Sequence, residues 1–291
     1  MPFGIATPPV RFPCLATSLS VNVHTLRVAA LCMAGHVTAA AAHAQTDYFN
    51  TDAGRPIRTE DAYAIERRAI ELQVAPLRLE RARGGAYRWG VEPEIAIGLL
   101  PRTQVEIGFP VEHTEGPRGT RTTALAGLEM SALYNFNHET HFPALAVVAD
   151  LLIPAGPAGP DRYVPSFKAI ATKTFPWARF HVNGQISLNR DAVNASVTSA
   201  NAELSRWTAG VAVDKTLPLK SMLFTAELVA SEPMTAGLAQ RWDAAGGSRI
   251  QLSPRVAFDV GGGYRLRGDE QGWFFTTGAA VAIGFPWAPR R

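Results

Sequence analysis

The protein has 291 residues, of which 47% are hydrophobic and 18% are charged. Its mean hydropathy is close to zero, at +0.01, and no stretch offers the ~18 uncharged apolar residues that a spanning helix needs. This composition excludes a helical membrane protein. It fits a water-soluble domain, and it fits equally well a barrel whose strands alternate lipid-facing with lumen-facing residues.

The N-terminal 44 residues have the composition of an export signal. They contain Arg11 and Arg27 but no Asp or Glu, and they end in an alanine-rich apolar run. The tripeptide Ala-His-Ala at 42–44 matches the small-residue site at which signal peptidases cleave. We therefore expect residues 1–44 to be a signal peptide cleaved after Ala44. A disordered alanine-rich leader is the alternative, and the long region before the apolar run leaves the true translation start open.

Both cysteines, Cys14 and Cys32, lie in this leader. The mature chain then has no thiol for a disulfide or a thiolate metal site. The formal net charge of the whole chain is +3, and the two arginines of the leader account for two of these three units. Because the remainder shows no clustered Lys/Arg face and no nucleic-acid motif, we expect no nucleic-acid partner.

The mature chain opens with a polar segment at 45–64, which we expect to be an N-terminal periplasmic tail; insertion into a barrel lumen is the alternative. A first strand follows at 66–81. Its apolar side switches near Ala75-Pro76, which indicates a bulge.

Strict period-two alternation defines the next strands. From Tyr87 to Leu99 the odd positions are apolar and the even positions are polar or small, and 103–112, 179–188 and 256–266 alternate in the same way. Such alternation predicts strands with two unlike faces. Fainter patterns bring the total to about twelve strands, in the range of outer-membrane barrels. The fainter strands are expected at 124–136, 143–153, 166–175, 203–215, 221–231, 242–253 and 271–285.

Short and long connections alternate along the chain. Tight turns containing proline occur at 100–102, 175–177, 216–219 and 253–254, and longer loops at 112–123, 154–165, 190–202 and 232–241. Outer-membrane barrels combine short periplasmic turns with longer outer loops in this way. The pattern favours an all-β fold, a transmembrane antiparallel up-and-down barrel over 65–286, followed by a C-terminal tail at 287–291.

Aromatic residues gather near the strand ends, while Val, Ile, Leu and Ala fill the middles. Two aromatic rings around an aliphatic band are typical of a bilayer-spanning barrel; an aromatic core in a soluble β-domain is the alternative. The ring expected near the longer loops comprises Tyr87, Trp89, Phe109, Phe167, Trp207, Tyr264, Trp273 and Phe275. The ring expected near the tight turns comprises Tyr134, Phe136, Phe175, Trp177, Phe180, Phe224, Phe258 and Phe285.

The chain contains four distinctive short motifs: Thr-Glu-Asp-Ala-Tyr at 59–63, Ile-Glu-Leu at 70–72, the strand–turn–strand at 97–107 and Leu-Ile-Pro-Ala-Gly at 152–156. Together these motifs resemble a bacterial outer-membrane family labelled for the meta-pathway of phenol degradation. The similarity covers about residues 60–285, and Pro101 and Ala155 replace the threonines that are commoner in the family. The resemblance implies an outer-membrane location and passage of small molecules.

By strand parity, one set of charged side chains points into the barrel. Isolated charges in a dry interior cost several kcal/mol each, so the lumen must be wet or densely networked. About twelve strands lie between the filled interior of an eight-stranded barrel and the aqueous channel of larger ones, so a narrow pore and a plugged barrel both stay open. The lumen-lining set is Glu92, Glu94, Glu106, Glu129, Asp150, Lys168, Arg179, His181, Asp214, Glu227, Asp259 and Arg265.

These features predict a channel in the Gram-negative outer membrane for passive uptake of small, aromatic or hydrophobic solutes. Its partners are then outer-membrane lipid and the solute, and the oligomeric state stays open. The alternatives are a structural barrel without a conducting pore and an outer-membrane lipid hydrolase. The hydrolase is disfavoured because His181 and Ser187 both point inward, away from lipid.

We expect no enzymatic activity, cofactor or metal. Glu92 and Glu94 share a strand face, as paired catalytic acids do, but lumen lining is the simpler interpretation. His138 and His141 flank Glu139 in an expected turn, which could form a metal site. Because a fourth protein ligand is lacking, a solvent-exposed turn is the favoured interpretation.

Overall fold

The computed structural model describes residues 51, 55–81, 87–115, 119, 121–188, 204–234, 237–269 and 271–284. Within this part of the chain no helix is long and apolar enough to span a membrane. The expected signal peptide at 1–44 and the expected tail at 287–291 lie outside the described residues. The strands are β1 (Ala69–Arg81), β2 (Tyr87–Val91), β3 (Glu94–Leu100), β4 (Thr103–Gly108), β5 (Val111–Glu115), β6 (Arg121–Leu125), β7 (Leu128–Asn135), β8 (Ala144–Ile153), β9 (Val164–Thr174), β10 (Arg179–Ser187), β11 (Ser205–Thr216), β12 (Met222–Pro233), β13 (Arg241–Ser253), β14 (Val256–Arg267) and β15 (Trp273–Gly284).

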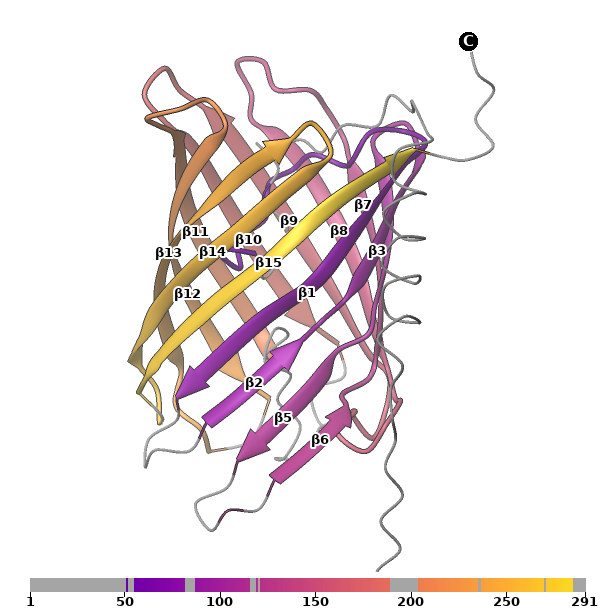
Figure 1. The fold of residues 1–291 in the computed structure, drawn as a ribbon, viewed down its shortest axis with the longest axis vertical. Helices are drawn as coiled ribbons and strands as arrows, with labels where there is room; N and C mark the ends of the chain where they lie inside the picture. The colour runs from indigo at the N-terminus through magenta and orange to yellow at the C-terminus, as the bar shows by residue number, and fades with distance from the viewer. Residues whose placement is uncertain are drawn as a thin grey trace, which may run out of the picture. The chain divides into compact units, whose positions relative to one another are not determined.

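Antiparallel pairing closes these strands into a barrel (Figure 1). Strand β1 pairs with β15 on one side and, along different parts of its length, with β2 and β3 on the other. In the same way β2/β3, β4/β5 and β6/β7 each occupy one position in the wall. The wall therefore has twelve positions, which confirms the predicted twelve-stranded antiparallel barrel.

Three wall positions are interrupted where one continuous strand was expected. The breaks fall at Glu92-Pro93, Phe109-Pro110 and Ala126-Gly127. Proline has no N–H to donate to the ladder, so two of the breaks follow from the sequence directly. The breaks lie side by side, because Phe109 N donates to Pro93 O at 3.0 Å and Ala126 N donates to Pro110 O at 2.8 Å.

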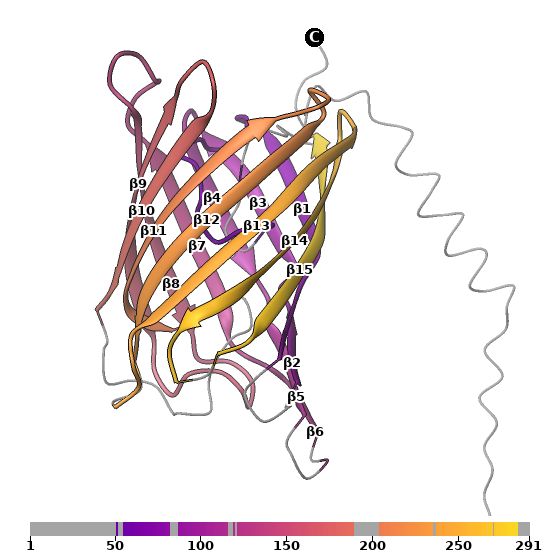
Figure 2. The same ribbon diagram turned by 90° about the vertical axis from the view of Figure 1, so that its left-hand side faces the viewer.

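Beyond these breaks the wall continues as a three-stranded extension of β2, β5 and β6. The expected loop at 112–123 is wrong in part, since Val111–Glu115 and Arg121–Leu125 are strands that pair with each other. Among the described residues β6 pairs with β5 alone, whereas β7 pairs with β8. Figures 1 and 2 show the extension running past the rest of the barrel at the end where β1 finishes.

The predicted bulge in the first strand is confirmed. The register of β1 against β15 shifts between Val74 and Leu77, that is, at Ala75-Pro76. The shift lets the strand bend around the curved wall while both of its halves stay paired.

The outer surface carries an apolar band with aromatic side chains towards both rims. Val182 and Val211, in the middle of neighbouring strands, are 53% and 52% exposed. The side chains that alternate with these valines and point inward are buried or partly buried. Exposed aromatics of the two expected rings include Tyr87, Phe109, Phe167, Tyr264, Trp273 and Phe275 at one rim and Tyr134, Phe136, Phe175, Trp177, Phe224 and Phe258 at the other. Phe285 lies outside the described residues.

The chain enters β1 through a tight turn at Glu66–Arg68 that packs on the inner wall. Arg68 has a positive φ of 66°, and its N–H donates to Gly98 O at 2.7 Å. A Cβ atom at Gly98 would overlap the carbonyl oxygen of Glu66. The glycine therefore lets the entering chain lie directly against β3.

This close approach gives a first test. We expect Gly98→Ala to lower the free energy of unfolding by about 1–3 kcal/mol, because the added methyl group must push the backbone of Glu66 away. Gly184→Ala is the matched control, since a Cβ atom there meets nothing within 4 Å. Both free energies are measured by urea unfolding in detergent, with heat-modifiable gel migration as the readout of the folded fraction. Equal losses of stability in the two variants would contradict the close contact between Gly98 and Glu66.

Candidate functional site: the barrel lumen

The lumen holds an N-terminal stretch of the chain itself, residues 55–65, called here the luminal segment (Figure 1). The preferred expectation, a periplasmic tail at 45–64, is therefore wrong for the described residues of this range. The physical reason is charge pairing, because the polar groups of the segment find partners on the inner wall that a free tail would lack. Thr51, which precedes the segment in the sequence, also contacts it, since Thr51 N donates to Asp61 Oδ2 at 3.0 Å.

Arg55 anchors one end of the luminal segment. Its guanidinium, 1% exposed, donates to Asp259 Oδ2 at 2.9 Å and to Gln73 Oε1 at 3.2 Å. Glu71 lies 3.7 Å away and Arg249 contacts the other oxygen of Asp259 at 3.8 Å. A charge buried this deeply is tolerable only with such partners, so Arg55 is held tightly against β1 and β14.

The next residues are held by Glu227 on β12. Its carboxylate accepts from the N–H groups of Arg58 and Thr59 and from Thr59 Oγ1, at 2.8–3.0 Å. The Arg58 side chain reaches Asp243 on β13 at 3.3 Å. One wall carboxylate thus satisfies two backbone donors of the segment, in the manner of a helix cap.

The remaining residues cross to β10, β9, β7 and β4. Glu60 and Asn183 exchange two backbone–amide hydrogen bonds at 2.8 and 2.9 Å, and Lys168 pairs with the Glu60 carboxylate. Ala62 N donates to Thr172 Oγ1 at 2.9 Å and Ile65 N to Gln104 Oε1 at 2.7 Å. Side chains of the wall thus form the hydrogen bonds to the backbone of this segment that a neighbouring strand would form in a sheet.

Glycines in the wall make room for the segment. A Cβ atom at Gly247 would lie 2.6 Å from Pro56 Cβ, and one at Gly261 would lie 2.7 Å from Pro56 O. These two glycines are register partners on β13 and β14. Pro56 therefore packs directly against the backbone of both strands at this point.

A buried cluster lies beneath Asp61 and Ala62. Arg179 donates to Asp214 at 2.7 Å, His181 Nε2 contacts the same carboxylate at 2.9 Å, and His181 Nδ1 lies 3.0 Å from Thr172 Oγ1. Hydroxyl, imidazole and carboxylate in series have the connectivity of a nucleophilic triad. Here, however, Thr172 is 0% exposed and its hydroxyl accepts from Ala62 N, so the cluster supports the luminal segment rather than facing a substrate.

The structure places the predicted lumen residues in two groups on the inner face. One group takes part in the arginine–carboxylate networks around the luminal segment and comprises Arg179, His181, Asp214, Glu227, Asp259 and Arg265. The other lies around a cavity on the opposite side and comprises Glu92, Glu94, Glu106, Glu129, Asp150 and Lys168.

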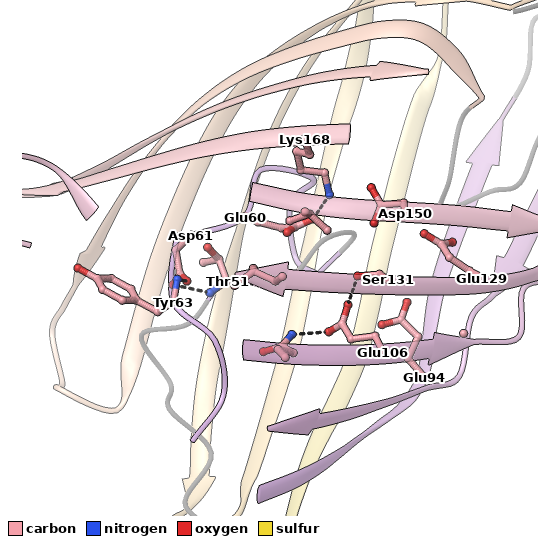
Figure 3. A pocket seen from close by; sticks show the side chains of 14 residues that line it. Thr51, Glu60, Asp61, Tyr63, Glu94, Glu106, Glu129, Ser131, Asp150 and Lys168 are labelled. Atoms are coloured by element: carbon pink, nitrogen blue, oxygen red, sulfur yellow. Dashed lines mark hydrogen bonds and ion pairs between the residues drawn. The ribbon is translucent and has the colours of Figure 1, made fainter. Parts of the chain in front are cut away.

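This cavity has a volume of about 50 Å³, enough for several waters. Thr51, Glu60, Asp61 and Tyr63 of the N-terminal chain form one side. Strands β3, β4, β7, β8 and β9 contribute the other, with Glu106, Ser131, Asp150 and Lys168 turned towards the space between them (Figure 3).

Several important residues were missed from the sequence. Arg55, Arg58 and Asp61 fall in a segment interpreted as a tail, and Thr172 is an uncharged residue in a faint strand. Asp243 was recoverable, because it lies on the inner face of a strand that had been expected at 242–253 and pairs with Arg265 at 3.0 Å.

The expected turn at 137–141 contains no metal site among the described residues. Glu139 instead accepts hydrogen bonds from Thr174 N at 2.7 Å and from Tyr63 Oη at 3.2 Å. The turn thus helps to hold the end of the luminal segment.

Solved structures with a similar fold are outer-membrane barrels. An outer membrane channel from Pseudomonas putida F1 matches with a TM-score of 0.52 and 11% identity, over 77% of this chain and 98% of that chain. The KdgM porin in complex with disordered oligogalacturonate matches with a TM-score of 0.45 and 12% identity, over 74% and 99% of the two chains. The translocator domain of the autotransporter NalP from Neisseria meningitidis matches with a TM-score of 0.40 and 10% identity, over 73% and 87%. Neither a protein-family profile nor a curated protein sequence matches this chain.

The fold and the first of these likenesses define the class: a closed, antiparallel, twelve-stranded β-barrel of the kind found in outer membranes. Within that class, the particular feature of this protein is a lumen occupied by its own residues 55–65.

The luminal segment gives a pH-dependent prediction. Burial raises the pKa of Asp61 to about 6 from an ordinary value of 3.8, against the opposing effects of Arg179 and His181. Because its folded pKa lies above its unfolded one, this carboxyl stabilises the fold fully below about pH 4 and loses that contribution as the pH rises through about 6. Asp61→Asn lacks this titration, so its melting temperature relative to the natural protein should rise between pH 4 and pH 7.

Thermal unfolding in detergent at stepped pH measures the effect. Asp161→Asn is the control, since Asp161 is exposed and lies outside the luminal segment. Parallel curves for Asp61→Asn and the natural protein would show that Asp61 does not titrate in this interval.

Proposed function

We propose that this protein is an outer-membrane channel for the passive passage of small solutes, and that the luminal segment closes it in the state described. The observation that carries the proposal is the chemistry of the closure. From Arg55 to Asp61 the segment is held by ion pairs and hydrogen bonds to polar side chains of the wall. Water entering the lumen can replace contacts of this kind, whereas a hydrophobic plug would have to be exposed to water at a cost of roughly 25 cal/mol per Å².

The two ends of the luminal segment differ in a way that supports movement. Ala62 packs in an apolar cluster with Leu133, Val148 and Ile170, and Ile65 packs against Ala69 and Ala96. Residues 62–65 therefore provide a fixed anchor next to β1. Release of 55–61 alone would open the centre of the lumen while the anchor stayed in place.

The outer surface supports a membrane location. An exposed aliphatic band between two aromatic rims is disfavoured in water and favourable in a bilayer. The export signal expected at 1–44 is consistent with this location, since an outer-membrane protein must leave the cytoplasm.

The resemblance found in the sequence suggests aromatic or hydrophobic solutes, and one internal feature agrees. Leu152, Val164 and Met234 form an apolar cluster with Leu204 packed against it, near the bases of the longer loops. A solute entering there would meet apolar side chains first and charged ones deeper in the lumen.

A structural barrel without a pore is the second candidate, and the density of the ion-pair network favours it. Asp259 and Arg249 are both fully buried, and removing a partner from such a pair is typically destabilising by 3–5 kcal/mol. The two candidates differ in whether displacing the luminal segment yields a conducting protein.

The membrane location is tested on the outer face. Val211 lies midway along β11 and is half exposed. If this face contacts lipid, Val211→Arg should cost about 2–4 kcal/mol and reduce refolding into bilayers, whereas Val211→Thr should have a small effect. Refolding yield by heat-modifiable migration measures both. An arginine variant that refolds as well as the threonine variant would argue against a lipid-facing position.

The channel itself is tested by displacing Pro56. Gly261→Val adds a side chain where Pro56 O lies 2.7 Å from the ideal Cβ position, so it should push the luminal segment off β14 and raise conductance in planar bilayers. Gly184→Val is the matched control, because its Cβ would meet nothing within 4 Å. A folded Gly261→Val barrel with the same negligible conductance as the control would favour the structural alternative.

A further inference from the structure

Exposed basic residues gather at the rim of the barrel that carries the tight turns. Those described at this rim are Arg67, Arg68, Arg102, Lys215 and Lys220. Glu66 is the single exposed carboxylate among the described residues of the same rim. The side chains of Arg102 and Lys215 donate to main-chain carbonyl groups. A carbonyl oxygen orients a cation without cancelling its charge, so this rim is positively charged.

The connection between β9 and β10, at this rim, holds three aromatic side chains in mutual contact. They are Phe175, Trp177 and Phe180, called here the aromatic platform. The ring centroids lie 6.4 Å apart for Phe175–Trp177, 5.7 Å for Phe175–Phe180 and 4.9 Å for Trp177–Phe180. Trp177 is nevertheless 62% exposed and Phe175 44%. Three rings that brace one another and stay exposed offer a firm apolar surface to a molecule outside the wall.

Lys215 lies on the outer face of the wall next to this platform. On β11 it shares that face with Val213, which is the register partner of Phe180 on β10. On the other side, the register partner of Lys215 is Phe224 of β12, which is 43% exposed. Side chains of register partners in an antiparallel sheet lie on one face and close together. Lys215 is therefore flanked by outward aromatic rings on both neighbouring strands.

The ammonium group of Lys215 ends at the turn of the aromatic platform. Its Nζ donates to Pro176 O at 3.4 Å, and it forms no ion pair among the described residues. Lys173, the register partner of Phe180 on β9, differs because its ammonium group contacts the Glu139 carboxylate at 3.2 Å. The platform is thus bordered by a neutralised lysine on one side and by a charged, exposed lysine on the other.

A ligand that uses both features combines a negative charge with apolar groups. A phosphate ion would use the ammonium group alone, and a neutral lipid would use the rings alone. An acidic protein bound from the water side would meet the exposed cations but not the outward rings of Phe180 and Phe224. An anionic phospholipid fits both, because its phosphate lies at the level of interfacial lysine and aromatic side chains while its acyl chains run along the wall.

We propose that Lys215 and the aromatic platform bind an anionic glycerophospholipid, with the phosphate at Lys215 Nζ and the acyl chains against the rings. This inference goes beyond the proposed channel function and does not depend on it. It rests on the proposed membrane location, which Val211→Arg tests separately.

Binding is tested by native mass spectrometry of the full barrel, refolded in detergent and mixed with equal amounts of phosphatidylglycerol and phosphatidylcholine that bear the same acyl chains. The natural protein should retain phosphatidylglycerol about fivefold better, because one basic residue at a membrane surface favours anionic lipid by roughly this factor. The preference should fall as the salt concentration rises, since salt screens an exposed charge. Equal retention of the two lipids at low salt would overturn the proposal.

Variants of the lysine locate the charge. Lys215→Gln should abolish most of the preference, whereas Lys215→Arg should keep it because the positive charge stays. Arg162→Gln is the matched control, since Arg162 is an exposed cation in the loop between β8 and β9, at the opposite rim. Heat-modifiable migration checks that each variant refolds. A preference in folded Lys215→Gln as large as that in Arg162→Gln would overturn the proposal.

A variant of the platform locates the acyl chains. Trp177→Ala should weaken the retention of both lipids, because it removes ring surface that the chains contact. Retention of phosphatidylglycerol equal to that of the natural protein would overturn the role of the platform.

Competition with glycerol phosphate, which has the headgroup charge without acyl chains, tests the source of the phosphate. In large excess it should leave phosphatidylglycerol bound, and displacement would overturn the lipid proposal in favour of a soluble phosphate compound. Equal retention of the two lipids, together with the expected refolding defect of Val211→Arg, would defeat this inference and leave the membrane location and the channel standing. If Val211→Arg refolds as well as Val211→Thr, the membrane location fails and this inference fails with it.

Discussion

The internal width of a twelve-stranded barrel is the constraint on which the rest of the structure depends. Such a ring is too wide for its own side chains to fill and too narrow for bulk water to hydrate every charge freely. Charged residues on the inner face therefore need partners from elsewhere in the chain. Residues 55–65 supply them, with Arg55 reaching Asp259 and the backbone of Arg58 and Thr59 reaching Glu227. Closure of the lumen is thus a consequence of satisfying buried charge.

The same constraint explains why the wall contains glycines where it meets the segment. An extended chain lying against a strand needs space at the height of the Cβ atoms. Gly98, Gly247 and Gly261 provide it for Glu66 and Pro56. On the outer face of the same barrel, Gly184 has open space around it. A glycine of the wall therefore makes room for the N-terminal chain only where it faces the lumen.

Closure also divides the lumen electrically. Arginines from the wall and from the luminal segment pair with the acids of β13 and β14. The acids of β3, β4, β7 and β8 face the remaining space instead.

Local patterns in the sequence were enough to determine the barrel. Alternation of period two, tight turns containing proline, and aromatics at strand ends are each set by residues near one another in the chain, and they predicted twelve strands, the bulge at Ala75-Pro76 and which face of each strand points inward. Parity also marked Glu94, Glu106 and Asp150 as inward. The position of residues 55–65 was decided only in three dimensions, because Arg55 and Asp259 are 204 residues apart and no local pattern relates them. The same holds for the acidic cavity, because Thr51, Glu60, Asp61 and Tyr63 border it only when the N-terminal chain lies in the lumen.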